Sequence, residues 1–265
     1  THLLPSEEES SFRLSGEHLS SSAFFTWQGQ FDKQNRPGGN LQLNNIDAAI
    51  IAPFLGRDSK DVDGTADVSG LLSLALQGEG EKPFDYTLKS TKVTVKNLKL
   101  KDNGVEWLSV PTLRCEPVSR INNITDLGNV FLKNSSVVLD SSNLPHLFQR
   151  FSERPTQHVI HGIDFSGTVR ITDKDRKIEA LDFTDTIFQA NRLEQQQVIE
   201  ENFVFTATVN KAGSMKTTGS LHIAPLQIST EIAFSGLTPE ALFSWFSSSP
   251  TFRQSQANLS GQGTF

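Results

Sequence analysis

Apolar and polar residues alternate with a period of two over most of this chain. Because successive side chains of a β-strand point to opposite faces, the alternation predicts strands that are apolar on one face and polar on the other. Clusters of turn-forming residues at 36–39, 101–104 and 172–175 separate these stretches. The pattern predicts about a dozen strands, mostly joined as hairpins.

The apolar positions of the clearest stretches are spread from residue 25 to residue 209, and we call them the apolar set. They are Phe25, Trp27, Phe31, Leu41, Leu43, Leu72, Leu74, Val93, Val95, Leu98, Leu100, Phe165, Val169, Ile171, Phe203, Phe205 and Val209. A strand buried on both faces would instead be a continuous apolar run. The sheet is therefore expected to fold over on itself, or to close around one apolar interior. The alternation changes phase at Asn97, which predicts a bulge or bend.

One sequence motif, which we call the repeated phrase, occurs three times. It begins with Pro among bulky apolar residues and ends in a strand-like stretch with Ser-Gly. Its closing glycines are at 70, 167 and 261, so the repeating unit is about 95 residues long. Short helices of about two turns are predicted at 144–151 and 238–246, where a Pro lies near the start. The predicted fold is all-β with a few short helices: an elongated, curled antiparallel sheet, or groove, built from these repeats.

The repeats predict continuous units rather than independent domains. They are a loose N-terminal segment at 1–11, a first β-groove unit at 12–113, a second at 114–209, and the start of a third, truncated unit at 210–265. The chain starts at Thr1 without a Met and without a signal-like pattern. We therefore expect it to be the middle part of a longer protein.

Composition argues against several classes of function. The net charge of -6 and the pI near 5.5 argue against a nucleic-acid surface, which needs a basic stripe. Cys115 is the only cysteine, which excludes an intrachain disulfide and a thiolate metal cluster. No apolar run is long enough to span a membrane. The 19 Phe, against 1 Tyr and 3 Trp, suit a deep apolar surface, although a β core explains most of them.

The polar side chains form no catalytic or metal-binding motif. His158 and His161 lie just before a strand, without a third ligand at zinc spacing. Asp61, Asp63 and Asp67 lack the Gly and closing Glu of a calcium loop, which favours solvated carboxylates. We expect no enzymatic activity, no catalytic residue, no metal and no cofactor. The lysines at 92, 96, 99 and 101 could meet anionic head groups, but an edge strand kept soluble by lysines is favoured.

Three stretches carry a resemblance to a known family. The first extends from Trp27 through Gly38-Gly39 to Gly70, the second from Thr94 to Leu113, and the third is the repeated phrase at 144–167 and 237–261. Together they resemble the AsmA-like proteins of Gram-negative envelopes, the superfamily that includes TamB and is related to the chorein-type bridge lipid carriers of eukaryotes. The resemblance covers most of the chain, but the N-terminal anchor expected of the family is absent.

The resemblance implies a groove that conducts phospholipid acyl chains between the inner and outer membranes, across the periplasm, and so contributes to outer-membrane lipid homeostasis. The apolar set would line this groove. The partners would be a phospholipid or another acyl-chain lipid, together with envelope proteins, and no nucleic acid. The full-length protein would be anchored in the inner membrane through its N-terminus.

Two other interpretations stay open. A structural or adhesive β-repeat module would seal the apolar face in a dry core and hold no ligand. A β jelly-roll hydrolase would need polar groups converging in a cleft, and no residue can be nominated for that role. A continuous open apolar groove with copurifying lipid would favour the lipid conduit.

Overall fold

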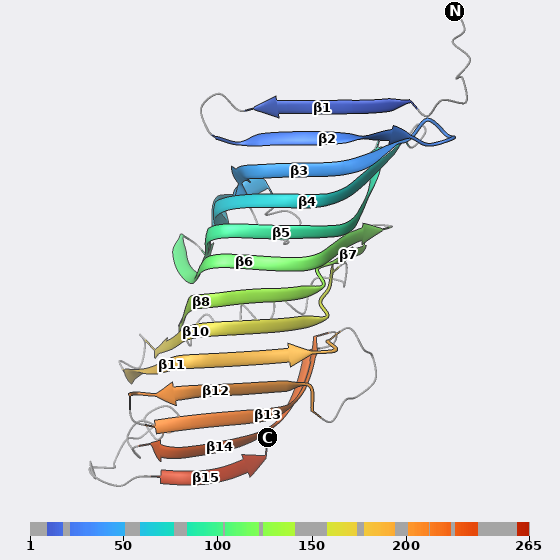
Figure 1. Ribbon diagram of the computed structural model, residues 1–265. Helices are drawn as coiled ribbons and strands as arrows, with labels where there is room; N and C mark the ends of the chain where they lie inside the picture. The colour runs from blue at the N-terminus through green and yellow to red at the C-terminus, as the bar shows by residue number, and fades with distance from the viewer. Residues whose placement is uncertain are drawn as a thin grey trace, which may run out of the picture.

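The structure, a computed structural model, forms one open sheet that curls without closing into a barrel (Figure 1). It describes residues 10–17, 22–50, 59–76, 84–102, 104–121, 124–140, 158–173, 178–193, 201–211, 213–223, 226–237 and 259–264. The prediction of an all-β fold with an elongated, curled sheet is confirmed. Among the described segments, no helix is long and apolar enough to cross a membrane.

Within the described residues, the sheet contains 15 strands. They are β1 (Ser11–Glu17), β2 (Phe24–Phe31), β3 (Pro37–Asp47), β4 (Val62–Leu76), β5 (Phe84–Asp102), β6 (Val105–Ile121), β7 (Ile124–Asp126), β8 (Asn129–Asp140), β9 (His158–Val159), β10 (Gly162–Asp173), β11 (Ile178–Asn191), β12 (Phe203–Val209), β13 (Gly213–Ile223), β14 (Leu226–Leu237) and β15 (Leu259–Thr264). Two short 3₁₀ turns, η1 (Ala48–Ile50) and η3 (Ser59–Asp61), lie between β3 and β4 in the part of this connection that the structure describes.

Strands that follow one another in the chain lie next to one another along most of the sheet. The spatial order is β1-β2-β3-β4-β5-β6-β8-β10-β11-β12-β13-β14-β15. Along this order only β8 and β10 are parallel, while β7 pairs with β6 and with β9. The sheet is therefore mixed, with one parallel pair in an otherwise antiparallel order. A parallel pair needs a crossover rather than a hairpin, and residues 141–161 supply the connection here.

Several predictions fall outside the described residues or at places where the sheet is continuous. The helices predicted at 144–151 and 238–246 lie outside the described residues. The boundary predicted after residue 113 falls within β6, and the one after residue 209 falls at the end of β12. Strand pairing continues on both sides of each place, between β6 and β8 and between β12 and β13. The division into units of about 95 residues stays a prediction.

Bulges interrupt four strands at Asn and Asp residues. Asn45, Asn97, Asn134 and Asp185 have φ values of 52°, 50°, 54° and 50°, and each lies at a shift in strand register. Asn and Asp visit this left-handed conformation more readily than other residues with a side chain. Because a bulge bends its strand and increases the local twist, these positions help the sheet to curl. The bulge predicted at Asn97 is confirmed.

The glycines that close the three repeated phrases occupy one kind of position. Gly70 in β4, Gly167 in β10 and Gly261 in β15 each adjoin a register shift. A Cβ atom at Gly70 would overlap Thr91, and a Cβ atom at Gly167 would overlap the backbone of Ser135. Glycine is required at these two positions because the neighbouring strand approaches too closely for a side chain.

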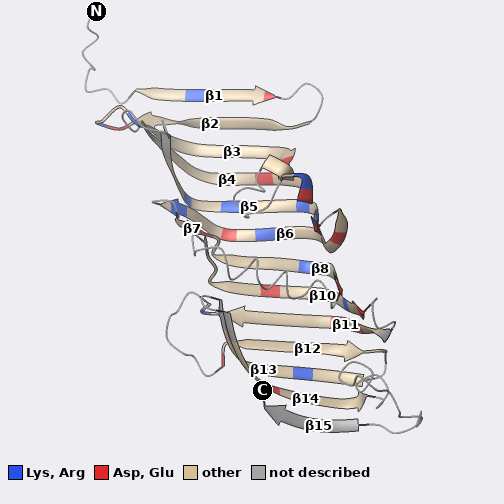
Figure 2. Cartoon of the chain, turned by 180° about the vertical axis from the view of Figure 1, so that it is seen from behind, with Lys and Arg blue, Asp and Glu red and all other residues tan. Residues whose placement is uncertain are grey.

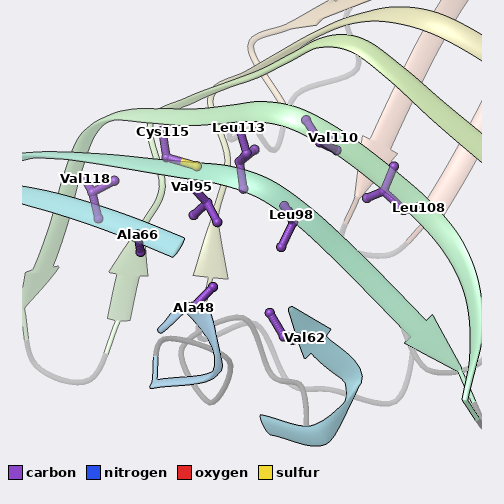
Figure 3. Packing of buried hydrophobic residues seen from close by; sticks show 10 residues of the cluster. All are labelled: Ala48, Val62, Ala66, Val95, Leu98, Leu108, Val110, Leu113, Cys115 and Val118. Atoms are coloured by element: carbon purple, nitrogen blue, oxygen red, sulfur yellow. The ribbon is translucent and has the colours of Figure 1, made fainter. Parts of the chain in front are cut away.

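The most deeply buried part of the fold lies between β3 and β8. There η1 and the start of β4 lie against the curled sheet, and Ala48 and Val62 are on the side toward which Val95 and Leu98 extend (Figure 3). We call this group the N-terminal cluster. Its buried members are Ala48, Val62, Ala66, Val95, Leu98, Leu108, Val110, Leu113, Cys115 and Val118.

Candidate functional site: the apolar inner face

Strand register places the whole apolar set on one face of the sheet, which we call the inner face. Paired residues of neighbouring strands share a face, so a row can be followed from strand to strand. One row crosses from β2 to β12 through Phe25, Leu43, Val68, Val93, Cys115, Val130, Ile163, Ala190 and Phe203. Every member of this row is apolar.

A second row lies alongside the first and continues farther toward the C-terminus. It crosses from β4 to β14 through Ala66, Val95, Leu113, Leu132, Phe165, Phe188, Phe205, Thr217 and Ile232. The apolar character therefore passes through the parallel pair of β8 and β10 without interruption. Every member of this second row except Thr217 is apolar.

The outer face carries most of the charges, and many of them are paired. Lys96 Nζ lies 2.7 Å from Asp67 Oδ2, Lys99 Nζ 2.9 Å from Glu106 Oε2, and Lys133 Nζ 2.6 Å from Asp164 Oδ2. Figure 2 shows acidic and basic positions on neighbouring strands from β4 to β10. Exposed pairs of this kind add little stability. They give the molecule a solvated outer surface.

Two of these pairs shift the pKa of a member. Hydrogen bonds from the Lys96 ammonium and the Asn45 backbone amide hold the pKa of Asp67 below its usual value. The Glu106 carboxylate raises the pKa of Lys99 through a hydrogen bond and its charge. In both cases the partner stabilises the charged form.

The lysines at 92, 96, 99 and 101 belong to β5, which pairs with β4 on one side and β6 on the other. The interpretation of this stretch as an edge strand is therefore wrong. Each of these lysines lies near a carboxylate on an adjacent strand: Glu116, Asp67, Glu106 and Asp63 respectively. The lysine ladder and the aspartates at 63 and 67 are thus parts of one ion-paired surface.

Catalytic chemistry finds no support in the described side chains. No group of three or more His, Cys, Asp or Glu residues within the described segments could hold a metal ion. His161 Nε2 lies 3.1 Å from Asp126 Oδ2, while the side chain of His158 is outside the described residues. Burial raises the pKa of the Cys115 thiol to about 12, so this cysteine is a packing residue rather than a nucleophile.

The inner face is closed in the N-terminal cluster. Val95 and Leu98, both from the apolar set, are 0% and 2% exposed. Trp107, Val130, Leu132 and Val137 pack against the cluster from β6 and β8. Protein atoms therefore cover these two side chains, and no surface of theirs is left for a ligand.

Farther along the chain the inner face is only partly covered: Phe165 and Val209 are buried, at 8% and 3% exposed, but the aromatic rings beside them are not. Phe183 and Phe205 form an edge contact with ring centroids 6.1 Å apart, and the rings of Phe188 and Phe203 lie 5.9 Å apart. All four rings are half-buried. Val169 and Ile171 of the apolar set lie beside them on β10, also half-buried. We call this part of β10 to β14 the C-terminal aromatic region.

The inner face also reaches the surface at β1 and β2. Phe12 packs against Trp27 and Phe31, with ring centroids 4.7 and 5.3 Å apart. Leu14 is 51% exposed and Phe25 is 40% exposed. The apolar rows therefore end at this edge of the sheet with carbon accessible to solvent.

The apolar set missed two aromatic residues that the structure adds to the inner face. Phe183 pairs with Val169 and Val209, and Phe188 pairs with Phe165 and Phe205. The bulge at Asp185 separates them and shifts the alternation by one residue. A change of phase at an Asp or Asn inside an alternating stretch is the sequence signal that could have identified them.

Comparisons of the chain with protein-family models, with curated proteins and with solved structures found no match. Inference about function therefore rests on the fold and on the chemistry of the inner face.

Proposed function

We propose that this chain is a non-enzymatic lipid conduit, in which acyl chains lie along the inner face and move across its strands. In this proposal it belongs to a periplasmic protein of AsmA-like type. That protein conducts phospholipid between the inner and outer membranes and so contributes to outer-membrane lipid homeostasis. The observation that carries the proposal is the pair of largely apolar rows that cross the sheet while charge is gathered on the outer face.

Elementary energetics supports this use of the inner face. Removing a methylene from water is worth about 0.8 kcal/mol, so a chain of ~16 carbons gains roughly 13 kcal/mol when it is fully covered. A carrier whose apolar lining is continuous keeps most of this free energy of burial while the acyl chain moves along the lining. The half-buried rings of the C-terminal aromatic region offer the carbon surface for such contacts.

The setting of the proposal comes from the resemblance described above. It places the full-length protein in the periplasm with an inner-membrane anchor, and it makes a phospholipid or another acyl-chain lipid the ligand. Envelope proteins would receive or deliver the lipid at the two ends. None of these steps needs a metal, a cofactor or a catalytic residue.

Native mass spectrometry of the purified chain, followed by organic extraction, tests the proposal. We expect phospholipid to copurify and to be lost from the variant Phe205→Asp, which puts a charge on the inner face. The matched control is Thr206→Asp, one residue along the same strand and on the outer face, which should retain the lipid. A ligand-free mass for the unmodified chain after gentle purification would reject the conduit.

A structural or adhesive β-repeat module is the second candidate, and the N-terminal cluster favours it. Val95 and Val110 are completely buried there, packed with Ala48 of η1 and Val62 of β4, as expected of a sealed core. If the whole inner face behaves in this way in solution, inner-face and outer-face variants will show the same absence of lipid.

A further inference from the structure

One cationic side chain lies on the largely apolar inner face. Arg120 in β6 pairs with Leu88 in β5, and Leu88 pairs with Leu72 in β4. Leu72 shares a face with Val68 and Gly70, so Arg120 lies on the inner face. Within the described strands, register places every other Lys and Arg on the outer face.

The Arg120 side chain is held by residues from both neighbouring strands. Its guanidinium carbon lies 4.8 Å from the centroid of the Tyr86 ring of β5, a cation–π contact. Its Nη1 donates a hydrogen bond of 3.2 Å to Thr125 Oγ1 of β7. Thr125 is 4% exposed. These contacts fix the planar group near the end of β6, where β7 joins the sheet (Figure 1).

The surroundings of Arg120 are apolar on one side and polar on the other. The row that contains it passes through Leu72, Leu88, Arg120 and Thr125. Tyr86 pairs with Leu74 in the adjacent row. A ligand lying along this row would meet two leucines and then the guanidinium, which the buried Thr125 holds through its hydroxyl group. That order matches a hydrocarbon chain that ends in an anionic head.

We propose that Arg120, held in place by Tyr86 and Thr125, binds the phosphate head of an acyl-chain lipid whose chain lies over Leu72 and Leu88. This inference rests on the proposed function and adds a head-group site to it. A guanidinium offers paired N–H donors that match two phosphate oxygens, and such charge-assisted bonds are stronger than neutral ones. Stacking on Tyr86 keeps the plane of the donors fixed before the lipid arrives.

A purely structural role makes a different prediction. If Arg120 only joins β7 to β6 through Thr125, its removal will lower stability and affect charged and uncharged ligands alike. If it binds phosphate, its removal will weaken the charged ligand selectively. The readout that separates the two roles is therefore head-group preference rather than total lipid binding.

The test compares three ligands by titration calorimetry with the 265-residue chain, each kept below the concentration at which it forms micelles. Dodecyl phosphate has the chain and the phosphate, dodecyl maltoside has the same chain with an uncharged head, and inorganic phosphate has no chain. We expect the unmodified chain to bind dodecyl phosphate about tenfold more tightly than dodecyl maltoside. Arg120→Gln should abolish that preference and leave dodecyl maltoside binding unchanged.

Two further variants control for folding and for general charge. Arg120→Lys keeps the charge but loses the planar fork, so it should recover only part of the preference for dodecyl phosphate. Arg170→Gln removes an arginine that pairs with Asp182 on the outer face, and it should keep the full preference. Circular dichroism shows whether each variant is folded.

The outcomes separate this inference from the proposed function. Equal affinity of the unmodified chain for the two dodecyl ligands, or an equal loss in Arg120→Gln and Arg170→Gln, would overturn the head-group site while leaving acyl-chain binding intact. Inorganic phosphate binding as tightly as dodecyl phosphate would also overturn it, because the chain would then contribute nothing. Failure of both dodecyl ligands to bind would reject the proposed function itself.

Discussion

The N-terminal cluster and the C-terminal aromatic region belong to one sheet face and share one alternating pattern, yet they differ in cover. In the N-terminal cluster, aliphatic side chains such as Val95 and Val110 are completely buried, and η1 and the start of β4 contribute Ala48 and Val62. In the C-terminal aromatic region, Phe183, Phe188 and Phe203 are half-buried. Alternation marks a face as apolar, but the segment packed over that face decides whether it is a core or a groove.

The difference has a consequence for the location of ligand binding. A sealed cluster gains its stability from protein contacts and tolerates neither a cavity nor a charge. A half-covered aromatic surface keeps carbon accessible to a ligand. In the conduit that we propose, the C-terminal aromatic region and the exposed β1–β2 end therefore contact lipid, while the N-terminal cluster mainly holds the curl of the sheet.

Val95→Asp should have the largest effect and breaks the sealed region. A carboxylate at this completely buried position would have no described partner for its charge, so we expect a loss of about 4 kcal/mol or more, enough to unfold a marginal protein. Urea denaturation followed by circular dichroism measures the loss. A folded Val95→Asp protein with near-normal stability would mean that the N-terminal cluster is open to water in solution.

Phe205→Asp makes the same chemical change in the other region and should be much milder. The half-buried site lets the carboxylate reach water, so we expect a cost of about 1–2 kcal/mol from lost apolar burial. The same urea titration compares it directly with Val95→Asp. If the two variants were equally destabilised, the contrast between a sealed and an open region would be wrong.

The repeated glycines allow a comparison of backbone packing in the two regions. Gly70→Ala places a Cβ against Thr91 at the N-terminal cluster, and Gly167→Ala places one against the Ser135 backbone at a φ of 154°. We expect each to cost about 2 kcal/mol, with Gly167→Ala the larger because backbone atoms yield less than a side chain. Thermal unfolding measures both. The unmodified protein is the reference. Gly29→Ala cannot serve as a control, because its Cβ would overlap Gly38 and Gly39.

The Asn97 bulge gives a smaller and more local test. Asn97 is exposed with a φ of 50°, so Asn97→Val should cost about 1–2 kcal/mol by forcing a β-branched residue into the left-handed region. Asn97→Gly, the control, should change stability by less than about 0.5 kcal/mol. Chemical denaturation of the pair decides the matter. Equal stability of both variants would show that the bulge is absent in solution.

The ion pair of Asp67 with Lys96 should have the smallest effect. Because the pKa of Asp67 is lowered in the folded protein, its contribution is present above the ordinary value of 3.8 and is lost as the pH falls through the lower folded value. We expect Asp67→Asn to cost less than about 1 kcal/mol at neutral pH and nothing at strongly acidic pH. Stability curves at several pH values test this. A pH-independent difference would assign the effect to packing instead.

Much of the candidate site could be predicted because face and period are local properties. Each strand of the apolar set alternates by itself, so Phe203 and Phe205 could be placed on one face without knowledge of their neighbours. The bulge at Asn97 was visible because clear alternation surrounds it. The bulge at Asp185 was harder to see, and Phe183 and Phe188 were missed as partners on the same face for that reason.

The cover over the inner face could not be predicted in the same way. Val95 and Phe205 both alternate with their neighbours at i±2 on one face, but only Val95 belongs to the buried cluster that contains Ala48 of η1. The lysine ladder was assigned to an edge strand because lysines commonly protect edges. In the folded sheet, carboxylates from β4 and β6 flank it instead, and residues distant in sequence supply them.

The sequence by itself determined the strands, their apolar and polar faces and the glycines at which neighbouring strands come close, because these depend on a two-residue period and on local backbone conformation. The tertiary structure alone decided three things: the parallel pairing of β8 with β10, the sealing of the N-terminal cluster, and the meeting of Arg120 with Tyr86 and Thr125. Each depends on which segments meet after the sheet has curled. The local alternation of apolar and polar residues carries no information about which segment will pack against a given strand.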